Sequence, residues 1–244
     1  MHKTEIKILK NMIKHVGEHH GELPHEQLTG FVAMKGSKFN GAIMVIGRAV
    51  NGWDNEWYPR DAASSSGTER IIGKIAKSVD IPLSWVSKRW GHNNGDYNTK
   101  KSAFWRTVRG VVSGLGLSGK ESTDWPDCIV WSNLYKVAPK DGGNPSSRLC
   151  SLQEQYCKEL LSAEIELYKP KRIIFSTGYD WAAPFIKDGS RFYAHTTTNR
   201  RTLVQAIASY KMRGGGRGKV VVAAHPQGKG DAKWINDVVR AFSA

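Results

Sequence analysis

The chain has 244 residues, 40% of them hydrophobic, and its 36 Lys and Arg against 22 Asp and Glu give a formal charge of +14 and an isoelectric point near 9.7. This length and apolar content predict a single domain, 1–244, with a full core, because no Pro- or Ser-rich linker divides the sequence. The charge argues against a cytosolic enzyme of small neutral substrates and favours a polyanionic partner, although surplus lysine can also serve solubility alone.

The predicted elements begin with an amphipathic helix over 1–16, followed by a buried strand over 41–46. A glycine-bounded loop, 47–52, and a Trp-rich polar loop come next. Two further helices are indicated by apolar residues at helical spacing, around 72–79 and 104–115. The Trp-, Asn- and Gly-rich segment 84–100 reads as a loop, and we treat 53–103 as an insertion-like loop region.

In the second half, a strand over 128–131, a long helix over 149–167 and a strand over 172–175 make a βαβ crossover. The apolar residues Val204, Ile207 and Ala208 suggest another helix. A glycine-rich basic loop then leads to a strand over 219–224, and a closing helix follows around 235–242.

Four short apolar strands separated by helices predict an α/β fold with a four-stranded, mostly parallel sheet sandwiched by helices. In such folds the ligand binds at the carboxyl ends of the strands. Asn133 and Lys136 follow the second strand, and His225 and Pro226 follow the last one. We therefore expect Asn133 and His225 to border one pocket, with loops 47–58 and 133–145 beside them.

The three cysteines, Cys128, Cys150 and Cys157, form no CxxC pair. Their odd number argues against a disulfide framework or a zinc ribbon and fits a reducing, cytoplasmic setting. The sequence shows neither a signal-peptide core nor a membrane-spanning stretch, so no membrane partner is expected.

Several motifs resemble the uracil-DNA glycosylase superfamily. The run Trp131-Ser-Asn-Leu-Tyr-Lys136 through Pro139, then Gly143-Asn-Pro145, a helix, Glu166 through Ile174 and Gly178, is similar to the middle of its iron–sulfur branch. His225-Pro226 resembles the superfamily's His-Pro-Ser motif, with Gln227 in place of serine. Phe104-Trp105 resembles an aromatic pair that opens a helix in the mismatch-specific branch.

The resemblance also shows departures. It implies an Asp or Asn two residues after Gly47 to position the attacking water, where this chain has Ala49. Neighbouring polar side chains become the candidates, with Asn51 first and Asp54 second, ahead of Arg48 and Glu56. The iron–sulfur branch has two cysteines near its N-terminus, whereas this chain has none before Cys128, so neither a cluster nor another cofactor or metal is expected.

Removal of a base passes through an oxocarbenium-like sugar while the base leaves as an anion, so a hydrogen-bond donor to the base is the main requirement. His225 is the candidate donor, and Asn133 is the candidate that reads the base edge. Gly47, Arg48 and Ala49 would line the pocket. Among the aromatic residues of the bordering loops, which are Trp53, Trp57, Tyr58, Trp90 and Tyr97, we favour Trp57 and Tyr58 as the ring that stacks on the base.

Phosphate contacts are expected from Lys136, from Gln227 and Lys229 after His225, and from Arg213 and Arg217 in the basic loop. The predicted activity is hydrolysis of the N-glycosidic bond of uracil or another modified pyrimidine, including a bulky phage-type modified cytosine. Because no lysine lies in a nucleophile motif, we expect a monofunctional enzyme that leaves an abasic site without cleaving the strand. DNA is the expected partner, and no obligate protein partner is evident.

Two rival interpretations remain open. The chain could be a DNA-binding protein that kept the fold and lost the chemistry, which the alanine at position 49 favours. It could also be a metal-dependent nuclease that uses Asp54, Glu56 and Asp61, although their spacing is unlike a metal site. A glycosylase would act in repair or in defence against foreign DNA.

Overall fold

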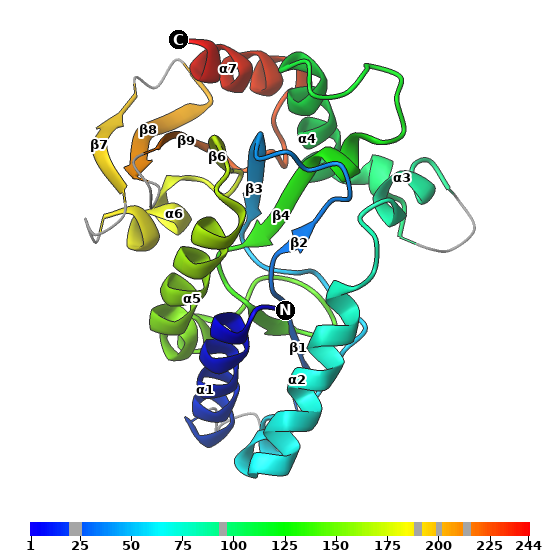
Figure 1. Ribbon diagram of the computed structural model, residues 1–244, viewed down its shortest axis with the longest axis vertical. Helices are drawn as coiled ribbons and strands as arrows, with labels where there is room; N and C mark the ends of the chain where they lie inside the picture. Colours follow the sequence, from blue (N-terminus) through cyan, green and yellow to red (C-terminus); the bar gives the residue numbers. More distant parts are fainter. Residues whose placement is uncertain (20–25, 93–96, 188–191, 199–201, 212–215) are drawn as a thin grey trace. The chain divides into compact units, whose positions relative to one another are not determined.

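The computed structural model describes residues 1–19, 26–92, 97–187, 192–198, 202–211 and 216–244 (Figure 1). The chain forms two compact units, each built from three segments. Unit 1 comprises Met1–Ala33, Arg48–Ile81 and Ser132–Leu167. Unit 2 comprises Met34–Gly47, Pro82–Trp131 and Tyr168–Ala244. The single-domain organisation stays a prediction, and the region 53–103 contributes residues to both units.

Unit 1 is mainly helical. It contains α1 (Lys3–His19), the short helix η1 (Pro59–Ala63), α2 (Ser65–Val79) and α5 (Ser147–Tyr168), together with the antiparallel strands β1 (Leu28–Gly30) and β5 (Val137–Pro139). The N-terminal helix buries Leu9, Met12, Ile13 and Val16 on one face, as the apolar spacing predicts. Gly17 allows close approach to η1, since a Cβ there would lie 2.6 Å from that of Ala62.

Unit 2 contains a seven-stranded mixed sheet in the order β2-β4-β3-β6-β9-β8-β7 (Figure 1). Its strands are β2 (Met34–Lys35), β3 (Ile43–Gly47), β4 (Ile129–Asn133, whose last two residues belong to unit 1), β6 (Arg172–Phe175), β7 (Phe192–Thr197), β8 (Val204–Lys211) and β9 (Arg217–Ala223). Neighbouring β3, β6 and β9 are parallel, while β2, β7 and β8 pair antiparallel with their neighbours. The α/β class is confirmed. The four predicted strands are β4, β3, β6 and β9, which are neighbours in the sheet. The prediction of a four-stranded sheet was wrong, because it missed β2, β7 and β8.

Strand β8 corrects one predicted element. Val204, Ile207 and Ala208 fit a helical spacing, but the buried positions Val204, Ala206, Ala208 and Tyr210 alternate with more exposed ones, which is the period of a strand. The helix prediction was wrong because small and polar residues carry part of this alternation. Pairing with β9 on one side and β7 on the other then fixes the strand.

The helices of unit 2 are α3 (Trp85–Lys88), η2 (Thr99–Lys101), α4 (Ala103–Gly114), η3 (Trp125–Cys128), α6 (Tyr179–Ile186) and α7 (Asp231–Ser243). The predicted loop 84–100 therefore contains one short helix and the start of another. Helix α4 packs tightly on α7, since a Cβ at Gly110 would lie 2.2 Å from Cδ1 of Ile235. Within the described ranges, no helix has the length and apolar character needed to cross a membrane.

Candidate functional site

The carboxyl edge of the parallel strands in unit 2 is the first part of the candidate site. Ile46, Phe175 and Val222 lie side by side in β3, β6 and β9. Each strand ends within one residue of this row, so the chain leaves all three at the same edge. This is the edge where open α/β sheets bind their ligands, because loops diverge from it and leave room.

His225 lies at this edge, two residues beyond β9, and is half-buried. Its Nδ1 accepts a hydrogen bond from the backbone N–H of Gln227 at 3.3 Å. A neutral imidazole that accepts at Nδ1 carries its proton on Nε2. The turn is closed by Lys229 N–H to Pro226 O at 3.0 Å, with Gly228 at φ +72°.

Two hydrogen bonds fix the backbone beyond the ends of β9 and β6. The indole Nε1 of Trp234 on α7 donates to the carbonyl oxygen of Ala224 at 2.7 Å, which fixes the residue before His225. The N–H of Gly178 donates to Ala223 O at 2.9 Å and ties the end of β6 to that of β9. Ser176, the first residue after β6, is fully buried, and its hydroxyl has no hydrogen-bond partner among the described residues.

The predicted phosphate contacts of unit 2 separate into two places. Gln227 and Lys229 are exposed in the turn after His225. Arg217 is the first residue of β9, so eight residues of extended chain, roughly 25 Å, separate it from His225. It therefore lies at the opposite end of the strand and does not border the carboxyl edge. Arg213 lies outside the described residues.

Asn133 ends β4 and belongs to unit 1, as do most of the remaining candidates. Its side chain is buried, with 2% exposure, and the amide nitrogen Nδ2 has no hydrogen-bond partner among the described residues. Leaving a buried donor unsatisfied costs about 1–3 kcal/mol. An acceptor on a bound ligand would remove this cost.

The predicted phosphate contact of Lys136 is wrong, because the side chain is fully buried and cannot contact a phosphate. Its Nζ donates to both carboxylate oxygens of Glu164 at 2.8 Å and to Ser132 Oγ at 2.7 Å. The Glu164 carboxylate also accepts hydrogen bonds from Ser132 Oγ at 2.7 Å and from the backbone N–H of Ala33 at 2.9 Å. This buried ion pair joins the start of β5 to helix α5 and has a structural role.

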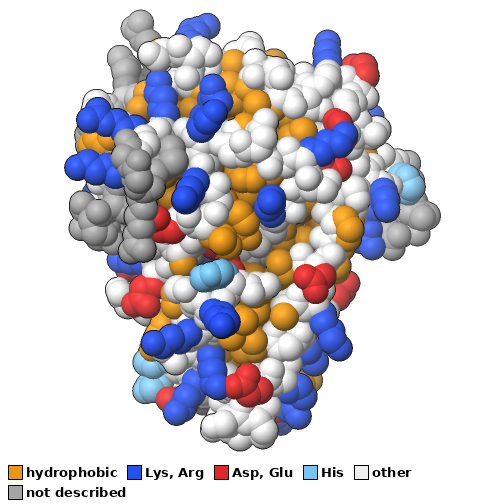
Figure 2. All heavy atoms as spheres, viewed as in Figure 1, with side chains coloured by type: hydrophobic (Ala, Val, Ile, Leu, Met, Phe, Trp, Pro, Cys, Tyr) orange, Lys and Arg blue, Asp and Glu red, His pale blue; other side chains and the backbone are white. Residues whose placement is uncertain are grey.

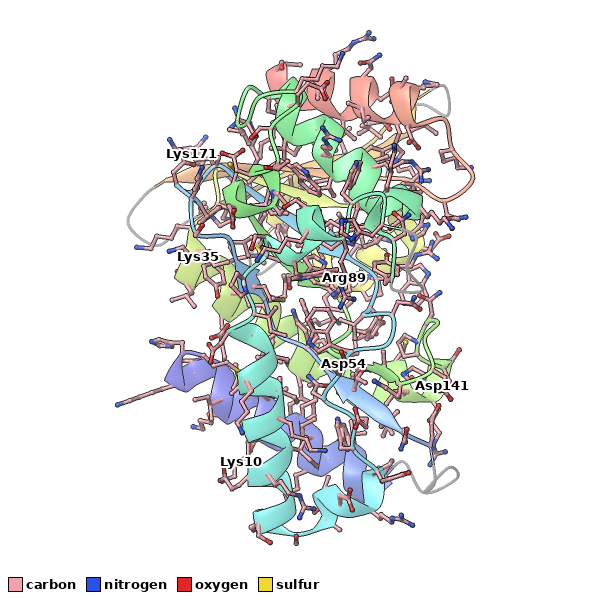
Figure 3. The ribbon with its side chains drawn as sticks, turned by 90° about the vertical axis from the view of Figure 1, so that its right-hand side faces the viewer. Lys10, Lys35, Asp54, Arg89, Asp141 and Lys171 are labelled. Carbon is pink, nitrogen blue, oxygen red and sulfur yellow. The ribbon has the colours of Figure 1, made fainter. Side chains whose placement is uncertain are left out.

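The two candidates for positioning water are already engaged in unit 1. Asn51 is exposed, and its Oδ1 accepts from the N–H of Gly143 at 2.8 Å, which links the loop after β3 to the loop after β5. The Asp54 side chain is 99% exposed and pairs with Lys140 at 3.1 Å. In Figure 3, Asp54 and Asp141 are labelled on these loops. An exposed, ion-paired carboxylate is poorly placed to hold one water in a dry pocket.

The start of the first motif divides between the units. Gly47 ends β3 in unit 2, and Arg48 and Ala49, both half-buried, begin the next segment of unit 1. The carbonyl oxygen of Arg48 accepts from the N–H of Tyr135 at 2.9 Å. Neither side chain is the Asp or Asn that the resemblance implies two residues after Gly47, so the predicted water-positioning group is not identified among the described residues.

The favoured aromatic residues have packing partners. Trp57 is 2% exposed, and its backbone pairs with that of Leu28, so it belongs to the core of unit 1. Tyr58 is half-buried, its hydroxyl accepts from Gln27 Nε2 at 2.7 Å, and the Arg60 guanidinium lies 4.7 Å from the ring centroid. Trp53 is half-buried and packs edge-on against Phe31 with centroids 6.0 Å apart. Tyr58 and Trp53 remain better placed than Trp57 to present a ring face.

Sequence reasoning missed several polar residues that organise these loops. Asn55 is buried and bonds through its amide to both backbone groups of Gly30 and to Ser78 Oγ. Gln153 on α5 accepts from the backbone of Lys136 and Val137 and donates to Val137 O. Neither stands in a motif, and only their polarity within apolar surroundings could have marked them.

Figure 2 shows Lys and Arg side chains dispersed over the visible face, with Asp and Glu among them. Over the described part of the chain, no group of three or more His, Cys, Asp or Glu could hold a metal ion. No model of a known protein family matches the sequence, and no curated protein matches it.

Proposed function

We propose that the protein is a DNA glycosylase that hydrolyses the N-glycosidic bond of uracil or another modified pyrimidine, including a bulky phage-type modified cytosine. The observation that carries the proposal is the hydrogen bond from Gln227 N–H to His225 Nδ1, which favours a proton on Nε2. This tautomer supplies a donor at the edge where a sheet of this class binds its ligand. The parallel strands β3, β6 and β9, with the adjacent β4, are compatible with the four-stranded core that the resemblance to the uracil-DNA glycosylase superfamily implies, and this supports the proposal.

The proposed step breaks the bond between C1′ of the deoxyribose and the base nitrogen. The bonding electrons leave with the base, whose developing negative charge accepts a hydrogen bond from the Nε2–H of His225. A water adds to C1′ and releases its proton to the solvent, from which the base anion is then protonated. Because Asn51 and Asp54 are both engaged elsewhere, the proposal places most of the catalytic effect on stabilising the departing base. A neutral imidazole suffices for this, so no proton transfer from His225 is needed.

Asn133 is the second residue of the proposal. Its unpartnered Nδ2 suits a carbonyl oxygen of the extruded base, which would satisfy a buried donor. This role rests on the burial of the amide and on the order of motifs along the chain. Replacement by Ala should therefore raise KM or relax the choice of base more than it alters the chemistry of a bound base.

The test incubates the protein with duplex and single-stranded DNAs that carry uracil, thymine mismatches, or hydroxymethylated and glucosylated cytosines, and cleaves the abasic sites with alkali. We expect strand breaks at one class of base, insensitive to EDTA. His225→Ala should lower the rate about 100- to 1,000-fold, the usual effect of removing one such donor. Its DNA affinity should be retained, and His15→Ala on α1 is the matched control.

The alternative is a DNA-binding protein without catalytic activity on the same fold. It is favoured by Ala49 together with the engagement of Asn51 and Asp54, which leaves no evident group to position water. Intact strands across the whole panel, with salt-sensitive binding that His225→Ala leaves unchanged, would establish this alternative. For the glycosylase we propose DNA as the partner, a cytoplasmic location, and a role in repair or in defence against foreign DNA.

A further inference from the structure

Unit 2 holds a concentration of aromatic rings that the proposed chemistry does not use. We call it the aromatic cluster, and its members are Trp85, Trp90, Tyr97, Phe104, Trp105, Trp125 and Trp131. Five of the nine tryptophans of the chain are therefore in one place. The rings come from α3, the segment after it, α4, η3 and β4, so several elements fix their positions.

The cluster has an inner layer that fixes an outer one. Trp105, Trp125 and Trp131 are 3%, 2% and 7% exposed and belong to the core. Trp85 packs on two of them, with centroids 5.9 Å from that of Trp105 and 6.3 Å from that of Trp131. Trp90 lies 5.8 Å from Trp125. The outer rings therefore rest on rigid neighbours and lose little further freedom when they bind a partner.

The outer layer reaches the solvent. Tyr97 is 47% exposed, one of only three large hydrophobic residues so exposed among the described residues, and its ring lies 6.5 Å from that of Trp85. Trp85, Trp90 and Phe104 are half-buried. A partly exposed group of rings that is anchored from beneath is typical of a surface used for stacking.

Cations are frequent in the segment that supplies most of these rings. Segment 82–110 carries six Lys and Arg and a single acidic residue, Asp96, which lies outside the described residues. Four of the cations are exposed, namely Lys88, Arg89, Lys100 and Lys101, and Arg109 lies 5.0 Å from the centroid of Trp90. The N–H of Thr99, the residue before Lys100, donates a backbone hydrogen bond to the carbonyl oxygen of Arg89 at 3.3 Å. Arg89 is labelled in Figure 3.

We infer that the aromatic cluster and its four exposed cations bind a single strand of DNA by base stacking and phosphate contact. Unpaired bases expose faces to an aromatic ring, whereas a duplex covers them, so this chemistry selects an unpaired strand. The choice of DNA rests on the proposed function. The surface itself requires no bond cleavage, and binding and cleavage are therefore tested by separate measurements.

The test measures fluorescence anisotropy of labelled dT15, of rU15 and of a 15-base-pair duplex over a range of salt concentrations. We expect the protein to prefer dT15, and Tyr97→Ala to weaken that binding about 5- to 100-fold while the duplex changes little. Tyr97→Phe keeps the ring and should retain the affinity. The pair Lys100→Glu and Lys101→Glu should reduce the slope of log K against log salt by about 1.4.

The matched control is the pair Lys3→Glu and Lys7→Glu, which makes the same change of net charge on exposed positions of α1. An equal loss of dT15 binding in this control would overturn the inference in favour of general charge. Unchanged binding in Tyr97→Ala, or tighter binding of rU15 than of dT15, would also overturn it. Absence of base excision with normal dT15 binding would instead reject only the glycosylase.

Discussion

The buried ion pair of Lys136 gives the sharpest test of the structure. In Lys136→Met the Glu164 carboxylate stays fully buried, loses both hydrogen bonds from Nζ and keeps those from Ser132 Oγ and Ala33 N–H. Removing one partner of a buried pair leaves an uncompensated charge and costs about 3–5 kcal/mol. With a urea m-value of about 3 kcal/mol/M for a chain of this length, the unfolding midpoint should fall by about 1 M or more.

The assay is urea unfolding at pH 7 followed by tryptophan fluorescence, together with DNA binding of the folded variant. The double variant Lys136→Met, Glu164→Leu removes both charges and should lose less stability than the two single changes together. If Lys136 instead contacted a phosphate, Lys136→Met would leave the midpoint unchanged and reduce the salt slope of duplex binding by about 0.9. That result would refute the buried pair.

Two further predictions concern buried titratable groups of the chain. Burial raises the pKa of Glu5 above its ordinary 4.5, so the folded state holds this proton more tightly and the stability of the fold decreases as pH rises from about 4.5 to the folded pKa. The variant Glu5→Gln should therefore unfold at a higher urea concentration than the native chain at pH 8 but not at pH 4. Equal urea midpoints for the two proteins at both pH values would contradict the burial of the carboxyl. Burial also raises the pKa of Cys150 to about 11 and of Cys157 to about 12. At pH 8 a thiol reagent should therefore react slowly with both cysteines in the folded protein, and quickly with all three cysteines in urea. Rapid reaction of three thiols without urea would contradict this prediction.

Much of the fold could be predicted because its main elements carry a clear period. Helices α1, α2, α4, α5 and α7 and the central strands β3, β4, β6 and β9 all follow apolar patterns that are local in the sequence. The short strands β1, β2 and β5 have two or three residues, too few for any period. Strand β8 was predicted as a helix because small Ala residues hold two of its four buried positions, which leaves the alternation of a strand weak. Its identity depends on pairing with β9.

The candidate site was less predictable, because the role of a polar residue depends on partners distant in sequence. Lys136 and His225 each follow a predicted strand, and both were expected to face DNA. Glu164, 28 residues after Lys136, converts that lysine into part of the core. The backbone of Gln227, two residues after His225, instead orients the imidazole at the sheet edge. No local pattern distinguishes the two cases, since both partners are ordinary polar residues.

The residues proposed to position water and those proposed to contact the base differ in how the protein holds them. Asp54 and Asn51 were proposed because a water needs an acceptor near the sugar, yet each already has a partner at the protein surface. His225, by contrast, is held on one nitrogen in a way that leaves its proton on the other, and Asn133 buries an amide nitrogen that has no partner among the described residues. The groups proposed to donate to a base are therefore better defined than any group proposed to activate water. A glycosylase with this balance should depend more on the leaving ability of the base than on the nucleophile, so its rate across a series of 5-substituted uracils should rise as the pKa of the departing base falls.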